Sequence, residues 1–105
     1  MKRKARYLAP ALAALLLLGA SAQVHSSDAS GATVGYTCMG CHGANGISKG
    51  SIVSLAGRNA EVMTRQLIDF KNDEREGTVM NRIAKGYTDE ELRAVAEFFA
   101  GLPAN

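Results

Sequence analysis

The chain has 105 residues, of which 47% are hydrophobic and 21% charged, with two Cys, two His and no Trp. This length and composition are typical of one ordinary globular domain, and they exclude a multidomain enzyme, a disordered acidic chain and a collagen-like chain. Twelve basic and ten acidic side chains give a formal charge of +2, and the basic residues form no patch that would indicate nucleic-acid binding.

Residues 1–22 are predicted to be a cleaved signal peptide. They carry four basic residues and no acidic one, followed by an apolar run over residues 11–20 and the small residues Ala20, Ser21 and Ala22. The run is too short for a membrane span, which takes about 20 apolar residues, so we expect no stable membrane anchor. Cleavage before Gln23 would leave a periplasmic domain of residues 23–105, in which eight basic and ten acidic side chains give a formal charge of −2.

The first predicted helix runs from an N-cap at Asp28 or Ser30 to about Cys41. The Ser-rich residues before it include His25, which we expect to be a solvated residue of the tail. The helix therefore carries both cysteines of the chain close to its end.

Gly31 and Gly35 lie four residues apart on one face of this helix. They either allow another helix to approach closely or break the helix, because each glycine costs about 1 kcal/mol of helix propensity. We predict a close approach with Phe98 or Phe99 of the last helix at the crossing.

The sequence CMGCH, residues 38–42, is typical of covalent haem attachment. Cys38 and Cys41 share one face of a helical turn, so their thiols can add to the two vinyl groups on one haem edge. His42 would then supply the proximal ligand of the iron. A thiol–disulfide exchange site would need a neighbouring strand, a zinc site would need four ligands, and a plain disulfide leaves His42 unexplained.

Residues 43–57 are predicted to form a glycine-rich loop that can wrap a flat ligand. Asn59 can cap a second helix over residues 60 to about 71. On that helix Met63, Leu67 and Phe70 recur at helical spacing and are predicted to form one buried stripe. Residues 72–77 are polar and are predicted to be a solvated loop.

Methionine is the expected second axial ligand, and residues 23–105 contain three. Met39 lies between the two cysteines and cannot reach the opposite haem face. Met63 lies in the apolar stripe, where methionine usually fills the core. Met80 follows the polar loop, where the chain can cross the open haem face, so we predict Met80 as the ligand.

The last helix has the clearest local signals. Thr88 and Glu91 form a capping box, and Gly101 can end the helix. Its apolar residues recur at helical spacing and are predicted to be buried: Leu92, Val95, Ala96 and Phe99.

Three segments, CMGCHG, LAGRNAEVMTRQLIDFK and GTVMNRIAKGYTDEELRAVAEFFAG, together resemble the small class I cytochromes c of the bacterial periplasm. This resemblance covers nearly all of residues 30–101. It implies an all-α fold of three to four helices around one covalent haem c, with Cys38 and Cys41 as thioether links and His42 and Met80 as axial ligands. The sequence departs from the family at Val53, near the position where a proline commonly supports the proximal histidine.

The segment TVMNRIAKGYTDEEL is similar to the haem domain of flavocytochrome c sulfide dehydrogenases. That resemblance implies an electron-transfer subunit that accepts electrons from an FAD-binding sulfide dehydrogenase subunit and is not catalytic by itself. A free electron shuttle between a periplasmic dehydrogenase and a terminal oxidase or reaction centre is the alternative. A gas sensor in which Met80 is displaced is a third hypothesis.

Overall fold

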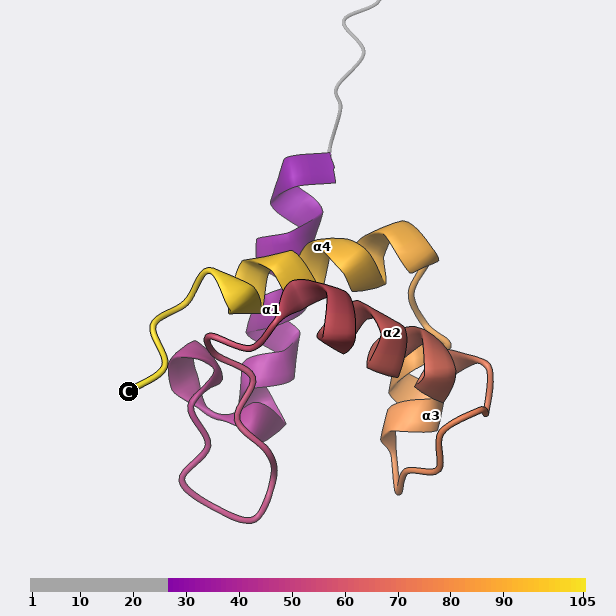
Figure 1. The fold of residues 1–105 in the computed structure, drawn as a ribbon, viewed down its shortest axis with the longest axis horizontal. Coiled ribbons are helices and arrows are strands. Elements are labelled where there is room, and N and C mark those ends of the chain that lie inside the picture. Colours follow the sequence, from indigo (N-terminus) through magenta and orange to yellow (C-terminus); the bar gives the residue numbers. More distant parts are fainter. Residues whose placement is uncertain (1–26) are drawn as a thin grey trace, which may run out of the picture.

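Helices form the regular structure of residues 27–105, the part of the chain that the computed structural model describes (Figure 1). The elements in chain order are α1 (Ser27–His42), the 3-10 helix η1 (Ala44–Gly46), α2 (Ala60–Lys71), α3 (Met80–Ala84) and α4 (Asp89–Ala100). No strand occurs in this range, which confirms the all-α prediction. The predicted signal peptide and His25 lie outside the described residues.

Helix α4 crosses α1 at the two glycines (Figure 1). A Cβ atom at Gly31 would lie 2.6 Å from the carbonyl oxygen of Ala94, and one at Gly35 would overlap the ring of Phe98. Tyr36 meets the same Phe98 ring edge-on, with ring centroids 6.0 Å apart. The prediction of a close helix crossing with Phe98 is therefore confirmed.

The core lies where α4 packs against α1 and α2. Its buried cluster consists of Val34, Met63, Val95, Ala96 and Phe99. The apolar face predicted for α4 is buried as expected, with Leu92 also inside. The stripe predicted for α2 was wrong in part, because Leu67 and Phe70 are only half-buried. The last turns of α2 face α3, and a helix of five residues is too short to cover them fully.

The helix caps agree with the local sequence at α2 and α4. The Asn59 side chain accepts a hydrogen bond from the Val62 amide, at 2.9 Å. Thr88 and Glu91 form both bonds of the capping box. Each pair satisfies backbone amides that a helix start leaves without partners, and this fixes where α2 and α4 begin.

Two local predictions need correction. The described part of α1 starts at Ser27, so Asp28 and Ser30 lie inside the helix and are not its caps. Helices η1 and α3 were not predicted, because elements of three and five residues are too short to show a helical repeat. No helix within residues 27–105 is both long enough and apolar enough to cross a membrane.

The loop after α1 folds back on η1 and α4. The amides of Leu55 and Ala56 both donate to the Gly46 carbonyl, at 2.8 and 3.0 Å, and the Gly57 amide donates to the Phe99 carbonyl at 2.9 Å. Gly46 has a φ of 73°, and a Cβ there would lie 2.7 Å from the Phe99 ring. The loop thereby holds residues 47–54 beside the end of α1.

Candidate functional site: the last turn of α1 and the start of α3

The two cysteines lie one turn apart at the end of α1, and both are free thiols. Cys38 is half-buried against the core, whereas Cys41 is exposed. Burial raises the pKa of the Cys38 thiol, the largest of several effects on it. Reactive cysteines of exchange sites have a lowered pKa, so this environment disfavours thiol–disulfide exchange. The neighbouring strand of such a site is also absent from residues 27–105.

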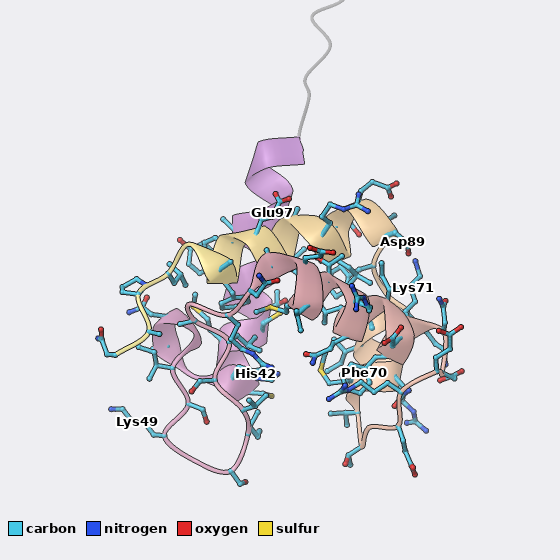
Figure 2. All side chains as sticks on the ribbon, in the orientation of Figure 1. His42, Lys49, Phe70, Lys71, Asp89 and Glu97 are labelled. Carbon is cyan, nitrogen blue, oxygen red and sulfur yellow. The ribbon has the colours of Figure 1, made fainter. Side chains whose placement is uncertain are left out.

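His42 is held by the backbone of the loop. Its Nδ1 atom lies 2.6 Å from the carbonyl oxygen of Val53. A carbonyl can only accept, so Nδ1 donates, and in the neutral ring Nε2 is then the atom that can bind a metal. The departure at Val53 therefore does not remove support from the histidine ring, since any residue supplies a backbone carbonyl. Figure 2 shows His42 on the side of α1 that faces α2 and α3.

The three methionines lie in different environments. Met63 is 4% exposed and belongs to the core cluster, while Met39 packs against that cluster from α1. Met80 is half-buried and is the first residue of α3. The burial of Met63 fits its predicted role as core filler. The structure thus brings Cys38, Cys41 and His42 together on one turn, and it places Met80 on a separate element.

Exposed apolar side chains occur on both segments that carry these residues. Four of the six large hydrophobic residues that are exposed are Ile52 (46%), Val53 (55%), Val79 (55%) and Ile83 (42%). Ile52 and Val53 belong to the loop that bonds His42, whereas Val79 precedes Met80 and Ile83 lies in the same helix. Large apolar side chains left exposed beside candidate ligands are typical of a surface that contacts a ligand.

The donor set and this surface fit a porphyrin. Cys38 and Cys41 supply two thiols on one turn, His42 supplies a free Nε2, and the apolar side chains suit a flat hydrocarbon ring system. Within residues 27–105 no three His, Cys, Asp or Glu side chains gather as the zinc alternative would require.

No family model matches the chain. It is 45% identical over 76 residues to the cytochrome subunit of sulfide dehydrogenase of Chlorobaculum tepidum, which covers 72% of this chain and 69% of that protein. It is 32% identical over 96 residues to cytochrome c-553 of Nitratidesulfovibrio vulgaris, covering 87% and 91% of the two chains. The chain belongs to the class I cytochromes c. This cytochrome therefore has covalent haem c as its cofactor and electron transfer as its function.

A third relative matches over a smaller part of its own length. The cytochrome is 38% identical over 69 residues to the thiosulfate dehydrogenase electron acceptor of Stutzerimonas stutzeri, which covers 64% of this chain and 32% of that protein.

Sequence reasoning missed two features of the cytochrome's site. One is the bond from His42 to the Val53 carbonyl: the resemblance pointed to position 53, but the valine there indicated a loss of support, whereas a backbone carbonyl is available from any residue. The other is the side chain of Asn81, which bonds to three parts of the segment before Met80. In the sequence, only the position of Asn81 next to Met80 could have indicated that it belongs to the site. Lys85, directly after α3, pairs with Asp73 at 2.6 Å.

Proposed function

We propose that the cytochrome transfers electrons in the periplasm through one haem c bound by thioethers to Cys38 and Cys41 and ligated by His42 and Met80. The donation from His42 Nδ1 to Val53 supports the first axial ligand, because it orients the ring and leaves Nε2 free. The burial of Met63 supports Met80 as the second axial ligand, because Met63 is the main alternative and its side chain is packed in the core. The predicted signal peptide supports export.

When bound, haem c supplies an iron that changes by one electron. The chain's own residues hold that group and set its ligand field. A protein that fills both axial positions offers no open position to a substrate, and a methionine ligand raises the reduction potential. This ligand set therefore suits electron transfer more than oxygen chemistry.

The electron donor that we propose is an FAD-containing sulfide dehydrogenase subunit. The observation that carries this proposal is the 45% identity, over 72% of the chain, to a cytochrome subunit of sulfide dehydrogenase. Oxidation of sulfide would reduce the flavin, and the flavin would pass its electrons one at a time to the cytochrome.

A free electron shuttle is the second candidate. It is supported by the similarity to cytochrome c-553, which extends over 91% of that protein. In that case the cytochrome would carry electrons between a periplasmic dehydrogenase and a terminal oxidase or reaction centre without a permanent partner.

Purification of the tagged holoprotein from the native periplasm separates the two. A sulfide dehydrogenase subunit would co-purify in a fixed ratio to haem, its flavin would be visible by fluorescence, and added sulfide would reduce the haem in the purified complex. A flavin-free monomer that sulfide reduces only when a separate dehydrogenase is added would instead support the shuttle.

A further inference from the structure

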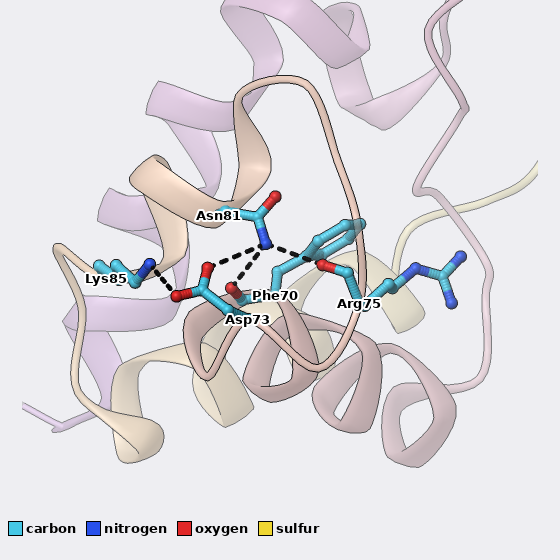
Figure 3. Close-up of polar contacts among 5 residues, drawn as sticks. All are labelled: Phe70, Asp73, Arg75, Asn81 and Lys85. Atoms are coloured by element: carbon cyan, nitrogen blue, oxygen red, sulfur yellow. Dashed lines mark hydrogen bonds and ion pairs between the residues drawn. The ribbon is translucent and has the colours of Figure 1, made fainter.

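The side chain of Asn81 connects the end of α2 to the start of α3 (Figure 3). Its Nδ2 atom donates to the carbonyl oxygen of Phe70 at 3.1 Å, to that of Arg75 at 2.7 Å and to Oδ1 of Asp73 at 3.3 Å. Phe70 belongs to α2, and the other two acceptors belong to the loop that follows it. A single amide group therefore ties α3 to three points along residues 70–75.

The same loop is packed against the Phe70 side chain. The guanidinium carbon of Arg75 lies 5.2 Å from the centroid of the Phe70 ring. A Cβ atom at Gly77 would lie 2.7 Å from Cε1 of that ring and 3.2 Å from Oδ1 of Asn81. Any side chain at position 77 would thus push the loop away from both Phe70 and Asn81.

An ion pair completes the connection. One oxygen of Asp73 accepts from Asn81, and the other lies 2.6 Å from Nζ of Lys85, directly after α3. Asp73 has a φ of 59°, a conformation that few residues other than Gly, Asn and Asp adopt readily. Both ends of α3 are therefore fixed to the same turn of the loop, as Figure 3 shows.

Hydrogen bonds hold the segment before Met80. The amides of residues 72–75 donate to the carbonyls of Ile68, Asp69 and Phe70 in α2, and Asn81 adds its side-chain bonds. All residues from 72 to 79 are exposed, so the segment buries no side chain that could fix its path. Met80 follows directly and is joined to Asn81 by one peptide bond. The backbone bonds end at residue 75, and the bonds that Asn81 donates hold the start of α3, and with it Met80, to the same part of α2 and its loop.

We propose that Asn81 is a positioning residue for the Met80 thioether, which it holds in place for coordination by fixing residues 70–80. The inference rests on the proposed ligation by Met80. It predicts that loss of the Asn81 amide lets Met80 leave the iron more often while the helices remain folded.

The test uses the oxidised holoprotein and imidazole as a competing ligand. Imidazole binds only when Met80 has left, so its apparent affinity reports how firmly Met80 is held. Asn81→Ala should raise the affinity for imidazole about tenfold, the equivalent of about 1.4 kcal/mol, because it removes hydrogen bonds of that combined worth. The long-wavelength charge-transfer band between sulfur and iron should weaken in parallel.

Asn72→Ala is the matched control, since Asn72 is an exposed asparagine of the same loop. It should leave imidazole affinity and the band unchanged. If Asn81→Ala matches this control while only its melting temperature falls, Asn81 has a structural role alone and the inference is wrong.

Asn81→Asp keeps the size of the side chain and provides a second test if Asn81→Ala fails to accumulate with haem. It replaces two N–H donors by acceptors that face the carbonyls of Phe70 and Arg75. We expect a larger increase in imidazole affinity than for Asn81→Ala, and unchanged affinity would overturn the inference.

Met80→Leu separates failure of the ligation from failure of the positioning role. If Met80→Leu keeps the charge-transfer band, Met80 is not the ligand and the proposed ligation is wrong. If Met80→Leu loses the band but the Asn81 variants keep the band and the imidazole affinity of the unaltered protein, only the positioning role is refuted.

Discussion

The α1–α4 crossing and the segment between α2 and α3 are stabilised in different ways. At the crossing, Gly31 and Gly35 let Ala94 and Phe98 come into direct contact, and the neighbouring core side chains are almost fully buried. Between α2 and α3, residues 72–79 are all exposed, and their path is held by backbone bonds to α2 and by the side-chain bonds of Asn81 and Asp73. Apolar contact fixes the first region, and hydrogen bonds in contact with water fix the second.

This difference places the two halves of the proposed haem site in regions that we expect to differ in rigidity. Cys38, Cys41 and His42 continue from the helix that forms the crossing. Met80 begins a helix of five residues that the exposed segment leads into. The comparison therefore predicts a histidine side that resists perturbation and a methionine side that can be loosened without unfolding the protein.

The largest expected effect is on the charge-transfer band, and it distinguishes Met80 from the buried Met63. Met80→Leu should abolish the charge-transfer band between sulfur and iron, because leucine has no donor atom. Met63→Leu should keep the band and cost less than about 1.5 kcal/mol of unfolding free energy, since the volume in the core is nearly conserved. Visible absorption and thermal unfolding of both holoproteins test this pair, and the reverse pattern would assign Met63 as ligand.

At the crossing, Gly35→Val should lower the melting temperature sharply, with a loss of about 3 kcal/mol, because the new side chain overlaps the Phe98 ring. Gly50→Val is a control at an exposed glycine outside the crossing, where a Cβ atom has no neighbour within 4 Å. Its melting curve should stay close to that of the unaltered protein. Equal curves for the two variants would show that the crossing tolerates a side chain.

A smaller effect is expected at the start of α4. Thr88→Ala removes the oxygen that accepts from the Glu91 amide at 3.1 Å and should cost about 1 kcal/mol. Thr88→Ser retains that oxygen and should recover most of the loss. Chemical denaturation of the two variants measures both values, and a serine variant as unstable as the alanine variant would contradict the role of the cap.

The smallest effect concerns the exposed segment and its dependence on pH. The hydrogen bond from Lys85, together with the charge of Lys85 and the bond from Asn81, lowers the pKa of Asp73. The ionised Asp73 carboxylate therefore contributes fully to folding stability above the ordinary pKa of aspartate, and this contribution is lost as the pH falls through the lowered pKa. The contribution is small because the pair is exposed to solvent.

Asp73→Asn isolates this contribution, since asparagine tolerates the positive φ of that residue. The variant should be slightly less stable than the unaltered protein at neutral pH, and the difference should vanish in acid. Denaturation at both pH values checks this, and a difference that persists in acid would show that charge is not its source.

The comparison also separates what local sequence predicts from what it does not. The Asn59 cap, the Thr88–Glu91 box and the buried face of α4 were predicted because their signals lie within a few residues of each other. Gly31, Gly35 and Phe98 were paired correctly because two glycines on one helix face mark a close approach. Helix α3 was missed because five residues show no repeat.

The sequence by itself determined the chemistry of this cytochrome: the order of thiols and imidazole in CMGCH specifies the type of attachment in any fold that makes a helical turn there. Only the tertiary structure decided what supports the proposed ligands. The carbonyl of Val53 reaches His42 across eleven residues, and the amide of Asn81 reaches back to Phe70 across the same separation. Such contacts depend on how two loops fold back, which is set by packing at a distance and not by the identity of neighbouring residues.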